Sequence, residues 1–258
     1  MPTRHSAIDI AVAGHHIAGT LVAPSAAIPG VLLVHGWDGS QAQYLARAHE
    51  IAALGCICLT IDLRGHARHH DLREAVTRED NLQDVLAGYD TLVGHPAVDP
   101  QSIAIVGSSY GGYLAALVSA LRPVRWLALR APAIYRDEQW DTPKGKLGRE
   151  DLMVYRHSAI APGDNRALTA CTSFRGDVLI VESETDKTVP HPVIENYLGA
   201  FKRVRSVTYR VISGADHALS SEASRQAYGM LLVSWMTEMV LGAKAATGLL
   251  RPAPHSPA

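Results

Sequence analysis

Short apolar runs alternate with longer stretches of helical periodicity along most of the chain. The run at residues 31–35 (VLLVH) is typical of a strand that is buried on both faces of a parallel sheet. The same patterns predict strands at residues 8–13, 16–22, 56–62, 102–106, 124–129, 178–181 and 206–212, and helices at residues 44–54, 81–93, 110–121, 192–201 and 222–241. Because strands and helices alternate, we expect an α/β fold with a mostly parallel, doubly wound sheet and an N-terminal hairpin.

Two segments depart from this alternation. Residues 132–177 are charged, rich in aromatic residues and without a clear strand, and they separate two expected strands. A loop longer than about 12–15 residues usually has a function of its own, and this one would lie over the sheet edge where such folds have their active sites. We therefore expect a single domain at residues 1–243 with a small lid at about 132–177. The Ala- and Pro-rich residues 244–258 are expected to form a flexible tail.

The composition indicates in which cellular compartment the protein is expected and which classes of partner are not expected. The chain has 258 residues, and its 24 Lys and Arg against 25 Asp and Glu leave no basic excess that would favour nucleic acid. The N-terminus leads into no apolar stretch of signal-peptide length, and residues 230–242 are too short for a membrane span. Three cysteines suit a reducing compartment. We expect a cytoplasmic protein with no nucleic-acid or membrane partner, and a homodimer is a common state for such a protein.

The strongest chemical signal is the sequence GSSYGG at residues 107–112. It lies where an expected strand meets an expected helix, which is the context that a G-x-S-x-G turn requires. Glycines on both sides remove the Cβ clashes of so sharp a turn, and the start of a helix favours negative charge. We expect Ser109 to be exposed there as a nucleophile, although a plain Gly/Ser turn would use the same letters.

A serine nucleophile needs a base that removes its proton and a carboxylate that orients the base. On this type of fold the chain order is Ser, then acid, then His, each after a strand. His217 follows the expected strand at 206–212 and is the candidate base, while Asp186 follows the strand at 178–181 and is the candidate acid. The other carboxylates considered for the acid are Glu182, Glu184 and Asp137.

A negatively charged tetrahedral intermediate needs backbone N–H donors that already point at it. The N–H of Tyr110, directly after the nucleophile, is one candidate. The N–H of Trp37, in the sequence HGWDG at residues 35–39, is the other, with Gly36 free to orient it. A plain turn is the alternative interpretation of HGWDG.

The histidines raise the question of a metal site. His66, His69 and His70 cluster in the sequence, but no matching cysteine or carboxylate spacing accompanies them. A polar loop is the preferred interpretation. We expect neither a metal nor a cofactor.

Together these motifs resemble those of the α/β-hydrolases over about residues 16–240. They are HGWDG, DLRGH at residues 62–66, GSSYGG, the Asp186 loop and His217. The segments SYGGY (109–113) and DKTVP (186–190) resemble the catalytic domains of prolyl-oligopeptidase-like enzymes and of small esterases. In those families D-x-R-G-H-G usually closes with glycine, where this chain has Ala67. The dienelactone hydrolases of the same superfamily use cysteine as nucleophile, and the serine at position 109 argues against that chemistry.

The implied activity is that of a serine hydrolase, for which a small carboxylic ester is the expected substrate. Its Ser-His-Asp mechanism would proceed through an acyl-enzyme. An amidase or small peptidase is the alternative, although oligopeptidases restrict access with a large extra domain for which this sequence has no residues. A hydrolase fold used only for binding is a third hypothesis, which the presence of all three triad residues and of the flanking glycines disfavours.

Four residues are candidates for contact with the substrate. Arg130 ends an expected strand at the active edge and could meet a substrate carboxylate, with a structural ion pair as the alternative. Three aromatic residues of the expected lid could line an apolar pocket or simply pack within the lid. They are Tyr135, Trp140 and Tyr155.

Overall fold

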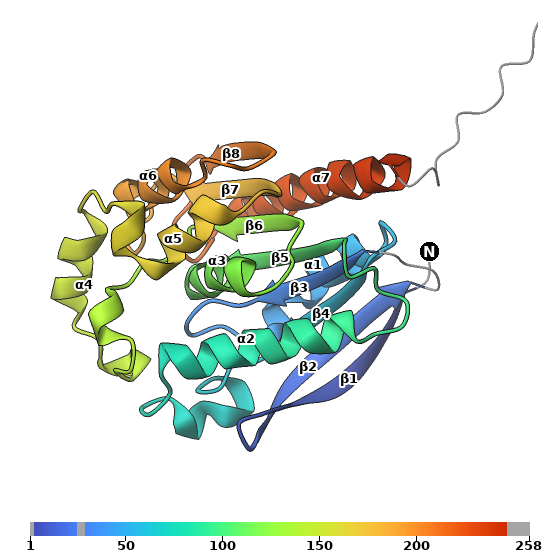
Figure 1. Cartoon of the computed structure of the whole chain (residues 1–258), viewed down its shortest axis with the longest axis horizontal. Coiled ribbons are helices and arrows are strands. Elements are labelled where there is room, and N and C mark those ends of the chain that lie inside the picture. Colours follow the sequence, from blue (N-terminus) through green and yellow to red (C-terminus); the bar gives the residue numbers. More distant parts are fainter. Residues whose placement is uncertain (1–2, 25–28, 247–258) are drawn as a thin grey trace, which may run out of the picture.

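Eight strands form one sheet at the centre of the molecule (Figure 1), in a computed structural model that describes residues 3–24 and 29–246. Their order across the sheet is β1-β2-β4-β3-β5-β6-β7-β8. The β1–β2 hairpin and the β2–β4 pair are antiparallel, and every other neighbouring pair is parallel. The strands are β1 (Thr3–Val12), β2 (His15–Pro24), β3 (Gly30–Val34), β4 (Ile57–Ile61), β5 (Ile103–Ser108), β6 (Trp126–Arg130), β7 (Asp177–Ser183) and β8 (Ser206–Ile212).

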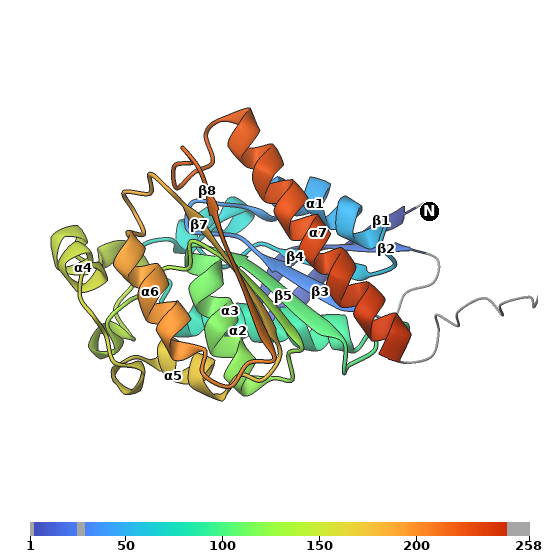
Figure 2. The ribbon, with the colours of Figure 1, turned by 90° about the horizontal axis from the view of Figure 1, so that it is seen from above.

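The helices cover both faces of this sheet (Figure 2). Helices α1 (Leu45–Ala52) and α7 (Glu222–Ala246) pack on one face, and α2 (Arg78–Val93), α3 (Tyr110–Leu121), α5 (Arg166–Ser173) and α6 (His191–Ala200) pack on the other. Successive side chains of a strand point to opposite faces. In β3, accordingly, Leu32 and Val34 join the core under α2 and α3, while Val31 and Leu33 join the core under α1 and α7.

This architecture confirms the predicted α/β fold with its mostly parallel sheet and N-terminal hairpin. Helix α2 begins at Arg78, three residues before the expected start at 81, because Thr77 and Asp80 form a reciprocal capping box. Helix α7 continues to Ala246 and so includes the first residues of the expected flexible tail. The rest of that tail, residues 247–258, lies outside the described residues.

The segment between β6 and β7, residues 131–176, contains no strand, as the sequence predicts. It contains four short helical elements before α5, namely η3 (Asp137–Gln139), η4 (Lys144–Lys146), α4 (Arg149–Arg156) and η5 (Pro162–Asp164). Helix α4 lies at one end of the molecule, far from α7 (Figure 1). In α5, however, Ala167, Leu168 and Cys171 are buried in the same core as α3. The last helix of the segment, α5, therefore belongs to the helical layer on this face of the sheet.

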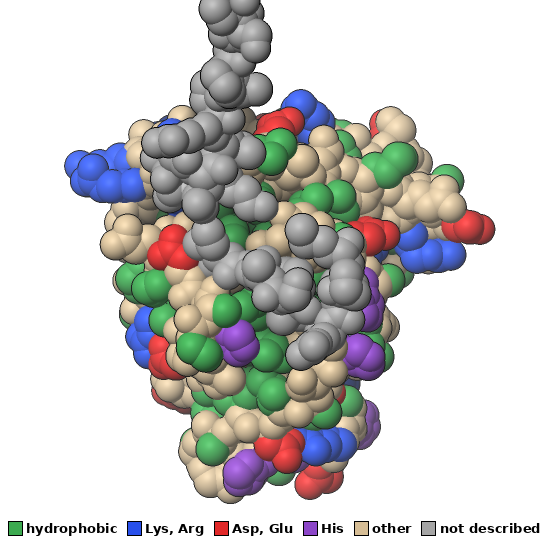
Figure 3. Space-filling model, turned by 90° about the vertical axis from the view of Figure 1, so that its right-hand side faces the viewer, with side chains coloured by type: hydrophobic (Ala, Val, Ile, Leu, Met, Phe, Trp, Pro, Cys, Tyr) green, Lys and Arg blue, Asp and Glu red, His purple; other side chains and the backbone are tan. Residues whose placement is uncertain are grey.

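The surface gives no sign of one dominant charge on the face that Figure 3 shows. Positive, negative and histidine side chains are scattered among hydrophobic ones there. Within the described residues, no helix combines the length and the apolar composition needed to cross a bilayer.

Two glycines with left-handed backbone differ in what surrounds them. Gly14, at the tip of the β1–β2 hairpin, has φ +78° and nothing within 4 Å of the position that a Cβ would occupy. Gly65, in the DLRGH motif, has φ +81°, and a Cβ there would lie 2.6 Å from Cγ1 of Val76. Two residues on, Ala67 also has a positive φ, 47°, which agrees with the glycine that the family pattern has at this place.

We expect Gly14→Ala to lower the free energy of unfolding by about 1–2 kcal/mol, because alanine is strained in a left-handed backbone. Gly65→Ala should lose that amount and about 1–3 kcal/mol more, because the new methyl group overlaps Val76. Urea denaturation of both variants measures the difference. Equal losses would show that the DLRGH loop is not tightly packed against Val76.

Candidate active site

Ser109 stands alone between a strand and a helix. Strand β5 ends at Ser108 and α3 begins at Tyr110, and Ser109 between them has φ 52° and ψ −115°. A positive φ is unfavourable for a residue with a side chain and persists only where the surroundings hold it. Here the N–H of Ser109 donates to the carbonyl of Arg130 (2.8 Å), and its carbonyl accepts from the N–H of Ala133 (2.9 Å).

The glycines of the motif are required by the closeness of neighbouring backbone. A Cβ on Gly107 would lie 2.4 Å from the carbonyl oxygen of Gly111. A Cβ on Gly111 would lie 2.3 Å from the carbonyl oxygen of Val34, at the end of β3. Both distances are too short for any side chain, so the G-x-S-x-G spacing follows from the geometry of this turn.

The structure brings the three predicted triad residues together. Nε2 of His217 lies 2.9 Å from Oγ of Ser109, and Nδ1 of His217 lies 2.6 Å from Oδ2 of Asp186. The three residues follow β5, β7 and β8, whose carboxyl ends meet at one edge of the sheet because these strands are parallel. Their hydrogen bonds therefore join positions up to 108 residues apart.

Asp186 and His217 are both held from behind. The second carboxylate oxygen of Asp186 accepts hydrogen bonds from the N–H groups of Thr188 and Val189, each at 2.8 Å. The Asp186 side chain is 2% exposed, and that of His217 is 23% exposed. The carbonyl of His217 accepts from Nη1 of Arg130 at 2.9 Å. The Asp186 carboxylate is thus fixed and shielded from solvent, while the His217 imidazole is partly exposed to the cavity in front of it.

The other carboxylates considered for the acid bind different groups. Glu184 accepts from the N–H of Gly214 (2.6 Å), and Asp137 accepts from the N–H of Arg166 (2.8 Å). Glu182 lies 2.9 Å from Nδ1 of His191 and also accepts from the hydroxyl of Tyr209. Of the four candidates, Asp186 alone hydrogen-bonds to the imidazole of His217.

Two backbone N–H groups remain free beside the nucleophile. Those of Trp37 and Tyr110 donate to no acceptor in the described part of the chain. Their residues are in contact, since the Trp37 and Tyr110 rings lie 5.5 Å apart. A Cβ on Gly36 would lie 3.3 Å from Cβ of Ser109, so the HGWDG loop passes directly by the nucleophile. Unpaired N–H donors at this point are what a developing oxyanion needs.

A cavity of about 550 Å³ opens in front of Ser109 and His217, a size usual for small-molecule sites. Its walls come from the HGWDG loop, the loop after η2 (Ala67–Leu72), η4, α4 and the Asp186 loop. Of the expected substrate-binding residues, only Tyr135 lines it.

The other three expected substrate contacts are corrected by the structure, which places them outside this cavity. Nη1 of Arg130 binds the carbonyl of His217, so its guanidinium supports the catalytic loop from behind. The indole N–H of Trp140 donates to Glu79 (2.9 Å), and the hydroxyl of Tyr155 accepts from Asn165 (3.2 Å).

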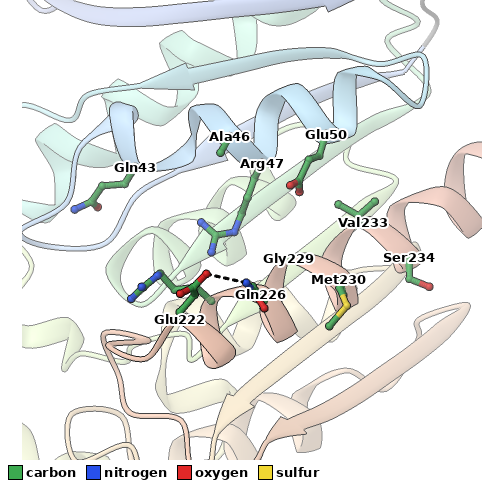
Figure 4. Close-up of a pocket in the computed structure, with 11 residues that line it drawn as sticks. Gln43, Ala46, Arg47, Glu50, Glu222, Gln226, Gly229, Met230, Val233 and Ser234 are labelled. Carbon is green, nitrogen blue, oxygen red and sulfur yellow. Dashed lines mark hydrogen bonds between the residues drawn. The ribbon is translucent and has the colours of Figure 1, made fainter.

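A larger groove, of about 790 Å³, lies between α1 and α7 on the other face of the sheet (Figure 4). Polar side chains of both helices line it, among them Arg47 and Glu50 of α1 and Glu222 and Gln226 of α7. None of the three triad residues lines this groove. The smaller cavity, which Ser109 and His217 line, is therefore the candidate active site.

The family follows from a match along most of the chain. The model of the prolyl oligopeptidase family matches residues 40–242, which contain all three triad residues. The chain belongs to this family. A comparison with curated proteins found no match.

Solved structures show the same fold at low sequence identity. A dienelactone hydrolase from Anabaena variabilis is 20% identical, with a TM-score of 0.66 over 92% of this chain and 98% of its own. Est1E from Butyrivibrio proteoclasticus is 16% identical, with a TM-score of 0.67 over 91% of this chain and 99% of its own. An acylaminoacyl peptidase from Pyrococcus horikoshii is 16% identical, with a TM-score of 0.66 over 90% of this chain and 41% of its own. The fold is that of the α/β-hydrolases.

Sequence reasoning missed a buried polar network under Tyr110. Nε of Arg64, in the DLRGH motif, donates to Asp84 at 2.6 Å. Asn81 donates to the same carboxylate (3.1 Å) and to the carbonyl of Arg64 (3.0 Å), and its own oxygen accepts from the hydroxyl of Tyr110 (3.0 Å). The network ties α2 and the DLRGH loop to the first residue after the nucleophile. Only the family pattern around Arg64 could have pointed to it, since Asn81 and Asp84 look like ordinary helix residues.

Two histidines, His35 of the HGWDG loop and His66 of the DLRGH motif, pack together beside Trp37. His35 is fully buried, and its Nε2 accepts from the N–H of Leu63 (3.1 Å). His66 packs edge-on against the rings of Trp37 (4.6 Å) and His35 (4.9 Å). Burial lowers the pKa of His66 to about 4, so this ring is neutral near pH 7. The interpretation of residues 66–70 as a polar loop is thus wrong at His66, which is an inward packing residue.

We expect a fluorophosphonate to form a covalent adduct on Ser109, because the adjacent imidazole of His217 can take the proton of the hydroxyl. Mass spectrometry locates the adduct. Ser109→Ala should abolish labelling and Ser108→Ala should retain it, since Ser108 is buried behind the nucleophile. Folded wild-type protein without an adduct on Ser109 would contradict the triad.

Proposed function

We propose that this chain is a serine esterase that hydrolyses carboxylic esters by an acyl-enzyme mechanism. The observation that carries the proposal is the continuous hydrogen-bonded chain from Ser109 Oγ through His217 to Asp186, with distances of 2.9 and 2.6 Å. A protein that used this fold only for binding would not need a serine with a strained backbone, such as Ser109, hydrogen-bonded through His217 to a buried carboxylate, such as Asp186. The family match supports the broader class of serine hydrolase.

The reaction has two steps that share the same groups. Ser109 Oγ attacks the ester carbonyl while Nε2 of His217 takes the hydroxyl proton, and the N–H groups of Trp37 and Tyr110 bind the oxyanion. His217 returns the proton to the leaving alcohol, and an acyl-enzyme forms. Water then attacks the acyl group with His217 again as base, which releases the acid and restores Ser109. Asp186 keeps Nδ1–H of His217 oriented throughout.

Two observations favour an ester over a peptide. A hyperthermophilic esterase from the archaeon Pyrobaculum calidifontis, 19% identical with a TM-score of 0.63, is matched over 86% of its length, and the acylaminoacyl peptidase over only 41% of its length. The cavity is of small-molecule size, about 550 Å³. An amidase or small peptidase is the second candidate, and the prolyl oligopeptidase family match is the observation that favours it.

We expect kcat/KM for a para-nitrophenyl ester to exceed that for the para-nitroanilide of the same acid by about 10³-fold or more, a barrier difference of ~4 kcal/mol. Both substrates release a chromophore, so one spectrophotometric assay measures them. Comparable values for the two substrates would instead support the amidase.

The roles of two carboxylates in one loop can be separated by matched variants. Asp186→Asn should lower kcat on the ester by about 10⁴-fold, because an amide no longer holds the His217 tautomer that accepts the serine proton. Glu184→Gln should leave kcat unchanged, since this side chain binds the N–H of Gly214. Thermal unfolding by circular dichroism checks that both variants fold. Equal activity losses in the two variants would remove Asp186 from the mechanism.

A further inference from the structure

Positive charge gathers around the cavity at the triad. Five cationic side chains line it against two carboxylates, and one of these carboxylates, Asp38, is paired with Arg73. The other, Glu74, is exposed. The remaining cations are Lys144, Arg149, Arg156 and Lys187. Arg149 and Lys187 are exposed to solvent, whereas Lys144 and Arg156 lie deeper.

Lys144 places its ammonium among aromatic rings. Its Nζ lies 4.4 Å from the ring centre of Trp37, 5.2 Å from that of Tyr135 and 5.6 Å from that of Tyr110. Within the described residues no carboxylate lies at ion-pair distance from it. Its backbone N–H donates to the carbonyl of Val76 (2.8 Å), which fixes η4 against the loop after η2.

Arg156 is more deeply buried and also has no counter-ion. The residue is 4% exposed, and its Nη1 donates to the carbonyl of Thr188 at 2.6 Å. Its Nε is buried and has no hydrogen-bond partner among the described residues. None of the ion pairs in the described part of the chain includes it. A buried guanidinium without a carboxylate is unfavourable unless something else supplies the negative charge.

The two cations lie near the same aromatic ring, that of Tyr135, so one anion beside this ring could contact both. The Lys144 ammonium and the Arg156 guanidinium lie 5.2 and 5.3 Å from the ring centre of Tyr135. Like charges so placed repel each other, and an anion between them would relieve that repulsion. The same cavity contains Ser109 and His217, and Lys144 touches the ring of Trp37, whose N–H is one oxyanion donor.

We propose that Lys144 and Arg156 bind a carboxylate of the substrate, so that the preferred substrate is an ester with a second, free carboxylate. This inference rests on the proposed esterase function. From the sequence, Arg130 is a candidate for the same chemistry, with a structural ion pair as the alternative, but its Nη1 donates to the carbonyl of His217. The carboxylate subsite instead lies in the segment between β6 and β7, on η4 and α4.

The preference for an ester with a free carboxylate should depend on pH through the protonation of Lys144. Burial lowers its pKa to about 8, and the charged groups that act on it are Arg156, Asp38, Arg73 and Arg78. Because an ammonium is charged only below its pKa, the preference for an anionic ester should be complete near pH 7 and should fall as the pH rises past about 8. The ratio of kcat/KM values reports this titration in the free enzyme.

The test compares acid esters with their neutral counterparts. In the first pair, para-nitrophenyl hemiglutarate carries its carboxylate in the acyl chain, and its methyl ester is the neutral counterpart. In the second pair, para-acetoxybenzoate carries its carboxylate on the alcohol side, and its methyl ester is again the neutral counterpart. We expect wild-type enzyme to prefer the acid by about tenfold or more in one of these pairs, as a charged hydrogen bond is worth ~1.5–3 kcal/mol. The pair that shows the preference identifies the side of the ester that carries the carboxylate.

Three variants locate the preference. Lys144→Gln and Arg156→Gln should each lower the acid-to-neutral ratio of kcat/KM by about tenfold. Lys146→Gln should leave it unchanged, because Lys146 belongs to the same helical turn but is exposed and lies outside the cavity. Lys144 is on a surface turn, so its variant tests the proposal even if the buried Arg156 variant does not fold.

The outcomes separate the carboxylate subsite from the esterase function. Hydrolysis of acid and neutral esters at equal rates overturns the subsite and leaves the esterase function standing. An unchanged ratio in Lys144→Gln also overturns it. Hydrolysis of no ester, with no adduct on Ser109, overturns the esterase function and the subsite together.

Discussion

Everything at the active edge depends on a hydrogen bond between residues 108 positions apart, from Ser109 Oγ to Nε2 of His217. No local preference could create it. The parallel order of β5, β6, β7 and β8 places the loops that follow β5, β7 and β8 at one edge, and the strained turn at Ser109 directs the nucleophile towards the imidazole. The glycines at 107 and 111, the fixed carboxylate of Asp186 and the guanidinium of Arg130 all serve this one contact.

Charge is distributed unequally on the two sides of the triad. Behind it, Arg64 contacts Asp84 at 2.6 Å, the buried His66 is neutral, and the guanidinium of Arg130 donates to the carbonyl of His217. In front of it, Lys144 and Arg156 line the cavity, and neither forms an ion pair with any of the residues that the structure describes. A folded protein tolerates buried charges of one sign where a ligand completes them. The segment between β6 and β7 therefore has two physical roles, since α5 builds the core while η4 and α4 shape and charge the cavity.

The sequence predicts those features that are set locally. Apolar runs such as residues 31–35 predict the buried strands. The G-x-S-x-G spacing predicts the turn at Ser109, because only glycine fits at positions 107 and 111. Ser109, Asp186 and His217 each follow one of the parallel strands, in the chain order expected of this type of fold, and this order predicts that they meet. Features set by packing between distant segments escape such reasoning. The sequence does not show that η4 contacts Val76 and that Lys144 therefore lies among aromatic rings. It also does not show that Arg130 binds the carbonyl of His217 in the loop after β8 and forms no ion pair among the described residues. Trp140 and Tyr155 show the same limit, because their orientation depends on Glu79 and Asn165.

The central claim is that one point in space is surrounded by Ser109, His217 and two free N–H groups. The most direct measurement is a crystal structure of the protein after reaction with a small fluorophosphonate. The account predicts a phosphorus atom bonded to Ser109 Oγ, with one phosphonyl oxygen accepting hydrogen bonds from the N–H groups of Trp37 and Tyr110 and with Nε2 of His217 beside the ester oxygen. A phosphonyl oxygen directed to solvent, away from both N–H groups, would contradict it.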